Sequence, residues 1–181
     1  MTFFRIKKIK GKEYAYIVEN KWKRTAKSVH ALRGVKPIGS RQKVKGYIGR
    51  AYRFDLNSDV DFLKFAESQN TDEYLNKRDI KKIINDLIEW EFFKFNIDER
   101  QFCIEINDKK VQRNKKDIAL LINDGFMCSL TLKNLLEFKI ENDEENDGYR
   151  LARAFVEAGI KVPQDIFIGL FSKLYKTQQL V

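Results

Sequence analysis

The sequence contains few of the residues from which metal centres and histidine-dependent active sites are built. It has one histidine and two cysteines. Cys103 and Cys128 are widely separated and have no neighbouring histidine, which argues against a zinc site. His30 alone cannot supply a histidine pair for acid–base catalysis. We therefore expect two buried free thiols, no metal site and no cofactor.

Long apolar runs and phosphate-binding glycine loops are also missing. No stretch approaches the ~18 uninterrupted apolar residues of a membrane span. The opening residues, MTFFRIKKIK, have no apolar core of signal-peptide length. P-loop, Rossmann and nucleophile-elbow motifs are absent from the sequence. These absences predict a cytoplasmic protein without a membrane partner and give no support to those enzyme classes.

Acidic residues are scarce in the first 54 residues, which contain only Glu13 and Glu19 beside 16 lysines and arginines. The other 127 residues hold 19 basic and 24 acidic side chains. The first segment therefore carries about +14 and the remainder about −5, an asymmetry typical of a polyanion-binding segment joined to an ordinary globular body. Eight aromatic residues interleaved with this charge favour nucleic acid as the polyanion. These aromatics are Phe3, Phe4, Tyr14, Tyr16, Trp22, Tyr47, Tyr52 and Phe54.

Lysine and arginine neutralise phosphates, and aromatic rings stack on unpaired bases. No recognition-helix motif favours readout of the DNA major groove. Both RNA and DNA therefore stay open, with a slight preference for structured RNA or ribosome association. The predicted binding residues are Lys7, Lys8, Lys10, Lys21, Trp22, Lys23, Arg24, Lys27, Arg33, Arg41, Lys43, Lys45, Tyr47, Arg50 and Arg53.

The same segment reads as a small antiparallel sheet. Runs rich in β-branched and aromatic residues predict strands over 4–10, 13–23 and 42–54, with a type II′ turn at Gly11-Lys12. Alternation predicts an apolar face that includes Tyr14, Tyr16 and Val44, with lysines opposite.

The long connection 24–41 is predicted to be a basic arm with a short helix from about Thr25 to Arg33. Gly46–Gly49 formally fits the GXXG loop of KH domains, but its flanks read as strand, and a bulge in a basic strand is the stronger interpretation.

The net charge changes sign at Asp55, which predicts two domains: 1–55, a basic β-rich nucleic-acid-binding module, and 56–181, a mixed helical and strand body. The predicted fold class is α+β: a small basic antiparallel sheet followed by a mixed α/β body ending in two packed helices. Gly159 is expected at a left-handed helix C-cap, and Pro163 in the first turn of the last helix. The body's remaining predicted elements are helices over 58–68, from 71 past 88, and from 129 or 131 to 138, strands over 92–95 and 102–106, and an acidic loop over 141–148.

The order FFRIKKIKGKEYAYIVENKWK followed by GSRQKVKGYIGR resembles the short β-rich module that opens many insertion-sequence transposases and small uncharacterised archaeal proteins. The resemblance covers about residues 1–54 and implies nucleic-acid binding. Thr25–Ile38 is inserted where that module is tighter, and no RNase H-like domain with three spaced carboxylates follows. Transposition is therefore not implied.

Two alternatives stay open for the body. Glu89, Glu91 and Glu105 are candidate carboxylates for a metal-dependent nuclease, although their spacing does not require it. The acidic residues of 143–147 miss the spacing of a calcium loop and are expected to form a solvated turn. The body is also a possible adaptor for a protein partner. We predict a non-catalytic nucleic-acid-binding protein.

Overall fold

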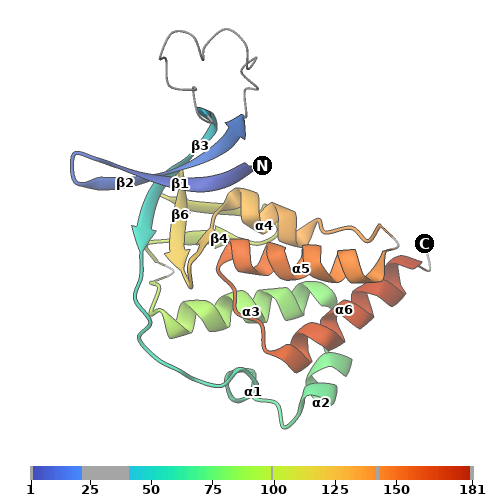
Figure 1. Ribbon diagram of the computed structural model, residues 1–181. Helices are drawn as coiled ribbons and strands as arrows, with labels where there is room; N and C mark the ends of the chain where they lie inside the picture. The colour runs from blue at the N-terminus through green and yellow to red at the C-terminus, as the bar shows by residue number, and fades with distance from the viewer. Residues whose placement is uncertain (1, 22–40, 99, 142, 180–181) are drawn as a thin grey trace, which may run out of the picture. The chain divides into compact units, whose positions relative to one another are not determined.

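The computed structural model describes residues 2–21, 41–98, 100–141 and 143–179 (Figure 1). The chain divides into two compact units, Met1–Ala51 and Tyr52–Val181. The sequence-based boundary at residues 55 to 56 lies just beyond this division. The fold class is α+β, as predicted: an antiparallel sheet comes first, and packed helices end the chain.

The first unit is built on three antiparallel strands in the order β1-β2-β3 (Figure 1). They are β1 (Thr2–Ile9), β2 (Lys12–Lys21) and β3 (Arg41–Arg53). The β-branched and aromatic residues of these segments fit the pleated surface of a sheet, so the three-stranded prediction is confirmed. The arm predicted for residues 24–41 lies almost wholly outside the described residues.

The β1–β2 hairpin turns at Lys10-Gly11, because Ile9 pairs with Lys12. Both central residues have positive φ, 48° at Lys10 and 75° at Gly11, which defines a type I′ turn whose twist matches that of the strands. The predicted type II′ turn at Gly11-Lys12 is therefore wrong by one residue. Gly11 tolerates the left-handed conformation at no steric cost.

Strand β3 carries two irregularities. The register of β2 against β3 shifts twice, leaving Lys45 and Ile48 without a directly opposed residue. Gly46–Gly49 therefore lies in a bulged strand and not between helices, so the bulge interpretation is confirmed and the KH-loop alternative is wrong. Each bulge reverses the alternation of side chains along β3. Val44, predicted to face the apolar side of a half-buried sheet, is 44% exposed.

The second unit contains four short strands and six helices among its described residues. The strands β4 (Cys103–Glu105), β5 (Lys110–Arg113), β6 (Lys116–Ile122) and β7 (Gly125–Met127) pair in antiparallel fashion with their neighbours in sequence. The helices are α1 (Phe62–Phe65), α2 (Thr71–Asn76), α3 (Ile80–Lys94), α4 (Ser129–Leu136), α5 (Glu144–Ala158) and α6 (Gln164–Gln179).

Side-chain oxygens define several helix starts. Asn70, Asp79 and Asp143 each accept a hydrogen bond from the backbone N–H three residues later, satisfying an amide that has no partner within the helix. Thr71 was expected to cap one long helix. Instead Asn70 begins α2 and Asp79 begins a separate α3, because each Asx residue offers its own cap.

Two predicted elements of the body are wrong. Residues 92–95 are the end of α3 and not a strand: Phe92 and Phe95 are buried while Phe93 is exposed, which fits a helical stripe. The acidic segment 141–148 is not a solvated loop, because α5 begins within it at Glu144. Carboxylates in the first turn of a helix interact favourably with its dipole, and Asp147 is fully buried there.

The end of α5 approaches β7 closely. Gly159 has φ 77° and forms the predicted left-handed C-cap. A Cβ at Gly125 would lie 2.3 Å from the Gly159 nitrogen and from the Val156 carbonyl oxygen. Pro163 immediately precedes α6, and its carbonyl accepts from the Phe167 amide. The rings of Phe155 on α5 and Phe167 on α6 are 6.4 Å apart between centroids.

One hydrophobic core holds the second unit together. Its largest fully buried side chains are Tyr74, Phe62, Phe155, Ile83, Leu87, Ile88, Ile118, Leu120, Ile122, Met127, Leu132 and Leu135. Both cysteines are free; Cys128 is buried as predicted, whereas Cys103 on the short strand β4 is exposed. Within the described ranges, every helix is too short or too polar to span a bilayer.

Candidate nucleic-acid interface

Three tyrosines gather on one face of the N-terminal sheet. The Tyr47 ring on β3 lies 5.3 Å from the Tyr16 ring and 6.3 Å from the Tyr14 ring, centroid to centroid. The rings are tilted by 53° and 41°. Tyr14 and Tyr16 are two residues apart on β2, so they point to the same side of the sheet. The result is a continuous aromatic patch across two strands.

Cations flank these rings on the same side. The register places Arg5 opposite Tyr16, and Tyr14 between Lys7 and Arg50. The Lys7 ammonium lies 4.9 Å from the centroid of the Tyr16 ring, within the range of a cation–π interaction. We call this surface the tyrosine face; it consists of Arg5, Lys7, Tyr14, Tyr16, Tyr47 and Arg50.

The tyrosine face is partly exposed. Tyr47 has 59% of its surface accessible, and Ile9 and Val44, which the register places on the same side, are also exposed. The pKa of the Tyr47 hydroxyl is raised by partial burial and by the neighbouring Tyr16 and Tyr14. The Arg5 guanidinium donates to the Gln42 side chain and so spans from β1 to β3 above Val18.

The opposite face carries other cations. Lys8 and Lys43 lie opposite the acids Glu13 and Glu19 in the register. The Lys45 Nζ lies 3.1 Å from the Glu19 carboxylate. That hydrogen bond lowers the pKa of Glu19 below its ordinary value. Lys45 is therefore partly neutralised.

The structure separates the predicted binding residues into three groups. Lys7, Tyr47 and Arg50 lie on the tyrosine face, and a second group is exposed elsewhere on the strands and their turn: Lys8, Lys10, Lys21, Lys43, Lys45 and Arg53. Trp22, Lys23, Arg24, Lys27 and Arg33 lie outside the described residues, as does His30, and of Arg41 only the backbone at the start of β3 is described.

The list of predicted binding residues does not contain Arg5, Tyr14 and Tyr16, which the structure places on the same face as Lys7 and Tyr47. The two tyrosines were assigned to the inner face of a half-buried sheet, and the lysines to the opposite face. A hairpin register drawn from Lys10-Gly11 would have placed Lys7 opposite Tyr14 and Arg5 opposite Tyr16. The sequences of β1 and β2 were therefore sufficient to place these four residues on one face, but the bulges of β3 made the position of Tyr47 unpredictable from its sequence.

The carboxylates considered for a nuclease differ in burial and in their partners. Glu91 is fully buried and accepts from Lys94 Nζ (3.0 Å), the Lys161 amide (2.9 Å) and Asn123 (2.7 Å). Glu89 is exposed on the same helix, and Glu105 is exposed on β4 beside Lys110. Among the described residues, no group of three or more histidines, cysteines or acids is placed to hold a metal ion.

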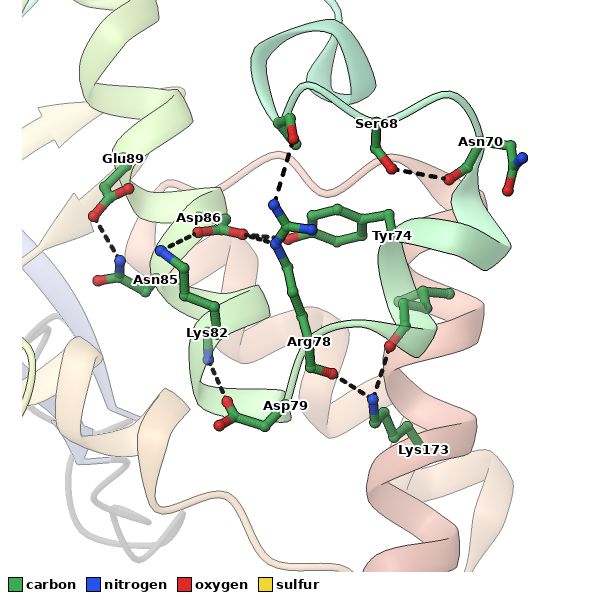
Figure 2. Close-up of polar contacts among 12 residues, drawn as sticks. Ser68, Asn70, Tyr74, Arg78, Asp79, Lys82, Asn85, Asp86, Glu89 and Lys173 are labelled. Atoms are coloured by element: carbon green, nitrogen blue, oxygen red, sulfur yellow. Dashed lines mark hydrogen bonds and ion pairs between the residues drawn. The ribbon is translucent and has the colours of Figure 1, made fainter.

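A second polar cluster joins three helices (Figure 2). Asp86 on α3 accepts from the Tyr74 hydroxyl of α2 at 2.9 Å, and both Arg78 and Lys82 lie 2.8 Å from its carboxylate. Lys173 of α6 donates to the Leu75 and Arg78 carbonyls. Burial and the nearby Asp86 raise the pKa of Tyr74. Asp86 therefore links α2 to α3, and Lys173 links α6 to α2 and to the turn that follows it.

Comparisons with family models, with curated proteins and with solved structures gave no match for this chain. The function must therefore be argued from the residues themselves.

Proposed function

We propose that this chain is a non-catalytic nucleic-acid-binding protein that contacts the phosphate backbone through its N-terminal sheet. The observation that carries the proposal is the imbalance of exposed charge on that sheet. Among the described residues its exposed cations are Arg5, Lys8, Lys10, Lys12, Lys21, Lys43, Lys45, Arg50 and Arg53, whereas its two acids, Glu13 and Glu19, are half-buried. Such a surface attracts a polyanion and releases its counterions.

The second unit supports the non-catalytic part of the proposal. Its most buried candidate carboxylate, Glu91, is already engaged by Lys94 and Asn123. A general base or metal ligand needs a carboxylate that can reach a substrate or an ion. Glu89 and Glu105 are exposed, and among the described residues no group of three or more acids, histidines or cysteines is placed to hold a metal ion.

The test is the salt dependence of binding, measured by fluorescence anisotropy with labelled RNA and DNA. The logarithm of affinity should fall linearly with the logarithm of salt, by about 0.9 per phosphate contact on duplex DNA and about 0.7 on single strands. Neutralising Lys7 and Arg50 together, as K7Q/R50Q, removes two cations that flank Tyr14 and should weaken binding and reduce the slope by about 1.5.

The matched control removes two exposed lysines from the second unit, K81Q/K176Q, and so changes net charge equally. Equal losses in both double variants would contradict a binding site on the sheet and leave only a general charge effect. Retention of a protein partner with no affinity for nucleic acid would favour the adaptor alternative. Strand cleavage with Mg²⁺ or Mn²⁺ that is lost in Glu89→Gln would contradict the non-catalytic assignment.

A further inference from the structure

The tyrosine face has a property that phosphate binding alone does not require. Backbone contacts need only cations at suitable spacing, yet Arg5, Lys7 and Arg50 surround three aromatic rings whose centroids are 5.3 and 6.3 Å apart. Tyr47 leaves 59% of its surface exposed. An accessible aromatic patch of this kind is a candidate surface for a ligand.

Unpaired bases are a chemically suitable partner for that patch. Every base has a flat π-face, and stacking on an aromatic side chain is tolerant of sequence. In a duplex the same faces are stacked on neighbouring base pairs and are closed to a protein ring. Cations beside the rings would hold the phosphates of a strand whose bases lie on Tyr14, Tyr16 and Tyr47.

The hydroxyls of the rings add a preference for ribose. Each tyrosine hydroxyl can donate and accept a hydrogen bond, and the 2′-hydroxyl is the group by which a protein distinguishes RNA from DNA. A tyrosine hydroxyl with its ordinary pKa near 10 is protonated at neutral pH and can donate, and partial burial and the neighbouring tyrosines raise the pKa of Tyr47 further.

We infer that the tyrosine face binds an unpaired RNA strand by stacking bases on Tyr14, Tyr16 and Tyr47 while Arg5, Lys7 and Arg50 contact its phosphates. The inference rests on the proposed function and narrows it from nucleic acid in general to single-stranded RNA. Loops and ends of structured RNA offer the same unpaired bases.

The experiment compares three probes with the full chain: a single-stranded RNA decamer, single-stranded DNA of the same sequence, and the corresponding RNA duplex, all at one salt concentration. We expect the single-stranded RNA to bind most tightly. Tyr47→Leu should weaken its binding about 5- to 150-fold, the range for loss of one stacked base. Tyr47→Phe should keep the stacking and reduce the preference for RNA over DNA.

Tyr149→Leu is the control, because Tyr149 on α5 is 72% exposed and lies in the other unit; its affinity should match that of the parent. Duplex binding as tight as single-strand binding, or full affinity in Tyr47→Leu, would overturn the inference and leave salt-dependent phosphate binding intact. Equal affinity for the DNA and RNA strands would overturn the assignment to RNA. Absence of salt-dependent binding to all three probes would instead refute the proposed function.

Discussion

The ammonium of Lys7 on β1 lies 4.9 Å from the centre of the Tyr16 ring on β2. A cation–π contact at such a partly exposed site contributes about 0.5–1 kcal/mol. That energy is too small to hold the hairpin together, but it orients a positive charge directly beside an aromatic surface. A phosphate reaching Lys7 would therefore bring its base close to the tyrosines.

Because of this geometry, substituting Lys7 should affect RNA binding more than substituting an ordinary surface lysine. Lys7→Gln should weaken RNA binding and lower the salt slope by about 0.7, the value for one phosphate contact on a single strand. Lys7→Arg should keep both, because arginine also carries the charge and stacks on aromatic rings. Anisotropy titrations at several salt concentrations would measure the slope. An unchanged slope in Lys7→Gln would show that this ammonium contacts no phosphate.

Glu19 should weaken the binding of RNA, because it neutralises Lys45 across a 3.1 Å ion pair. Glu19→Gln removes the negative charge and releases Lys45, so affinity for RNA should rise and the salt slope should steepen. The matched change Glu67→Gln, at an exposed residue of the other unit, should have a smaller effect. A loss of affinity in Glu19→Gln, with the fold intact, would contradict this role.

The same pair predicts a titration shift. Hydrogen bonding to Lys45 lowers the folded-state pKa of Glu19 below the ordinary 4.5, so its contribution to stability is present above pH ~4.5 and is lost as pH falls through the folded value. Lys45→Ala should raise the pKa of Glu19 toward 4.5, measurable by NMR titration of the carboxyl carbon. Because the Lys45 side chain is 47% exposed, solvent screens the pair, and the accompanying change in stability should be small.

Glu91 should be among the most costly side chains to remove from the second unit. Glu91→Ala leaves the Lys94 ammonium, which is 4% exposed, without its carboxylate and removes an acceptor from Asn123 and from the Lys161 amide. Breaking a buried ion pair in this way typically costs about 3–5 kcal/mol. Glu89→Ala, at an exposed site two residues away, should stay within about 0.5 kcal/mol. Urea unfolding of the two variants gives the comparison, and similar midpoints would contradict the buried role of Glu91.

Asp86 should stabilise the junction of α2, α3 and α6 in a pH-dependent manner. Asp86→Ala removes the hydrogen-bond acceptor of the Tyr74 hydroxyl and the ion-pair partner of Arg78. It should lower the free energy of unfolding by about 2–3 kcal/mol, whereas Tyr74→Phe should lower it by about 1 kcal/mol. Hydrogen bonding to Asp86 raises the pKa of Lys82, and burial followed by Asp86 raises that of Tyr74. Both contributions are complete below pH ~10 and are lost as pH rises through the raised values.

Thermal unfolding from pH 7 to 11 would therefore show a steeper alkaline decline in the parent than in Asp86→Ala. Parallel curves would mean that Asp86 does not set these two titrations.

Sequence patterns correctly predicted those structural features that depend on neighbouring residues alone. Alternation and β-branched residues located β1 to β3, and Gly159 marked the end of α5 because a left-handed C-cap favours glycine. The segment 92–95 was wrongly predicted to be a strand, because a short apolar run fits a strand as well as a buried helix end. The acidic run was misread because the charges that suit a loop also suit a helix N-terminus.

The tyrosine face depended on information that single-strand patterns do not contain. Tyr47 joins Tyr14 and Tyr16 only because two bulges in β3 change which side chains share a side. A bulge is a property of the pairing of two strands and not of either alone. Likewise, the partners of Glu91 come from segments far apart in sequence, Asn123 and Lys161.

Close backbone approach, rather than conformational freedom, should decide the effect of substituting Gly125. A Cβ there would lie 2.3 Å from the Val156 carbonyl oxygen and from the Gly159 nitrogen, and backbone atoms at a helix end cannot move aside as a flexible side chain can. Gly125→Ala should therefore lower the free energy of unfolding by at least 1–3 kcal/mol, the range for overpacking.

Gly148→Ala is the matched control. Gly148 lies inside α5, and the nearest atom to its added Cβ, on Phe171, is at 3.9 Å. Since alanine suits a helix interior better than glycine by about 0.5–1 kcal/mol, this control should raise the melting temperature while Gly125→Ala lowers it. A Gly125→Ala variant as stable as the parent would show that β7 and the end of α5 are not packed this tightly.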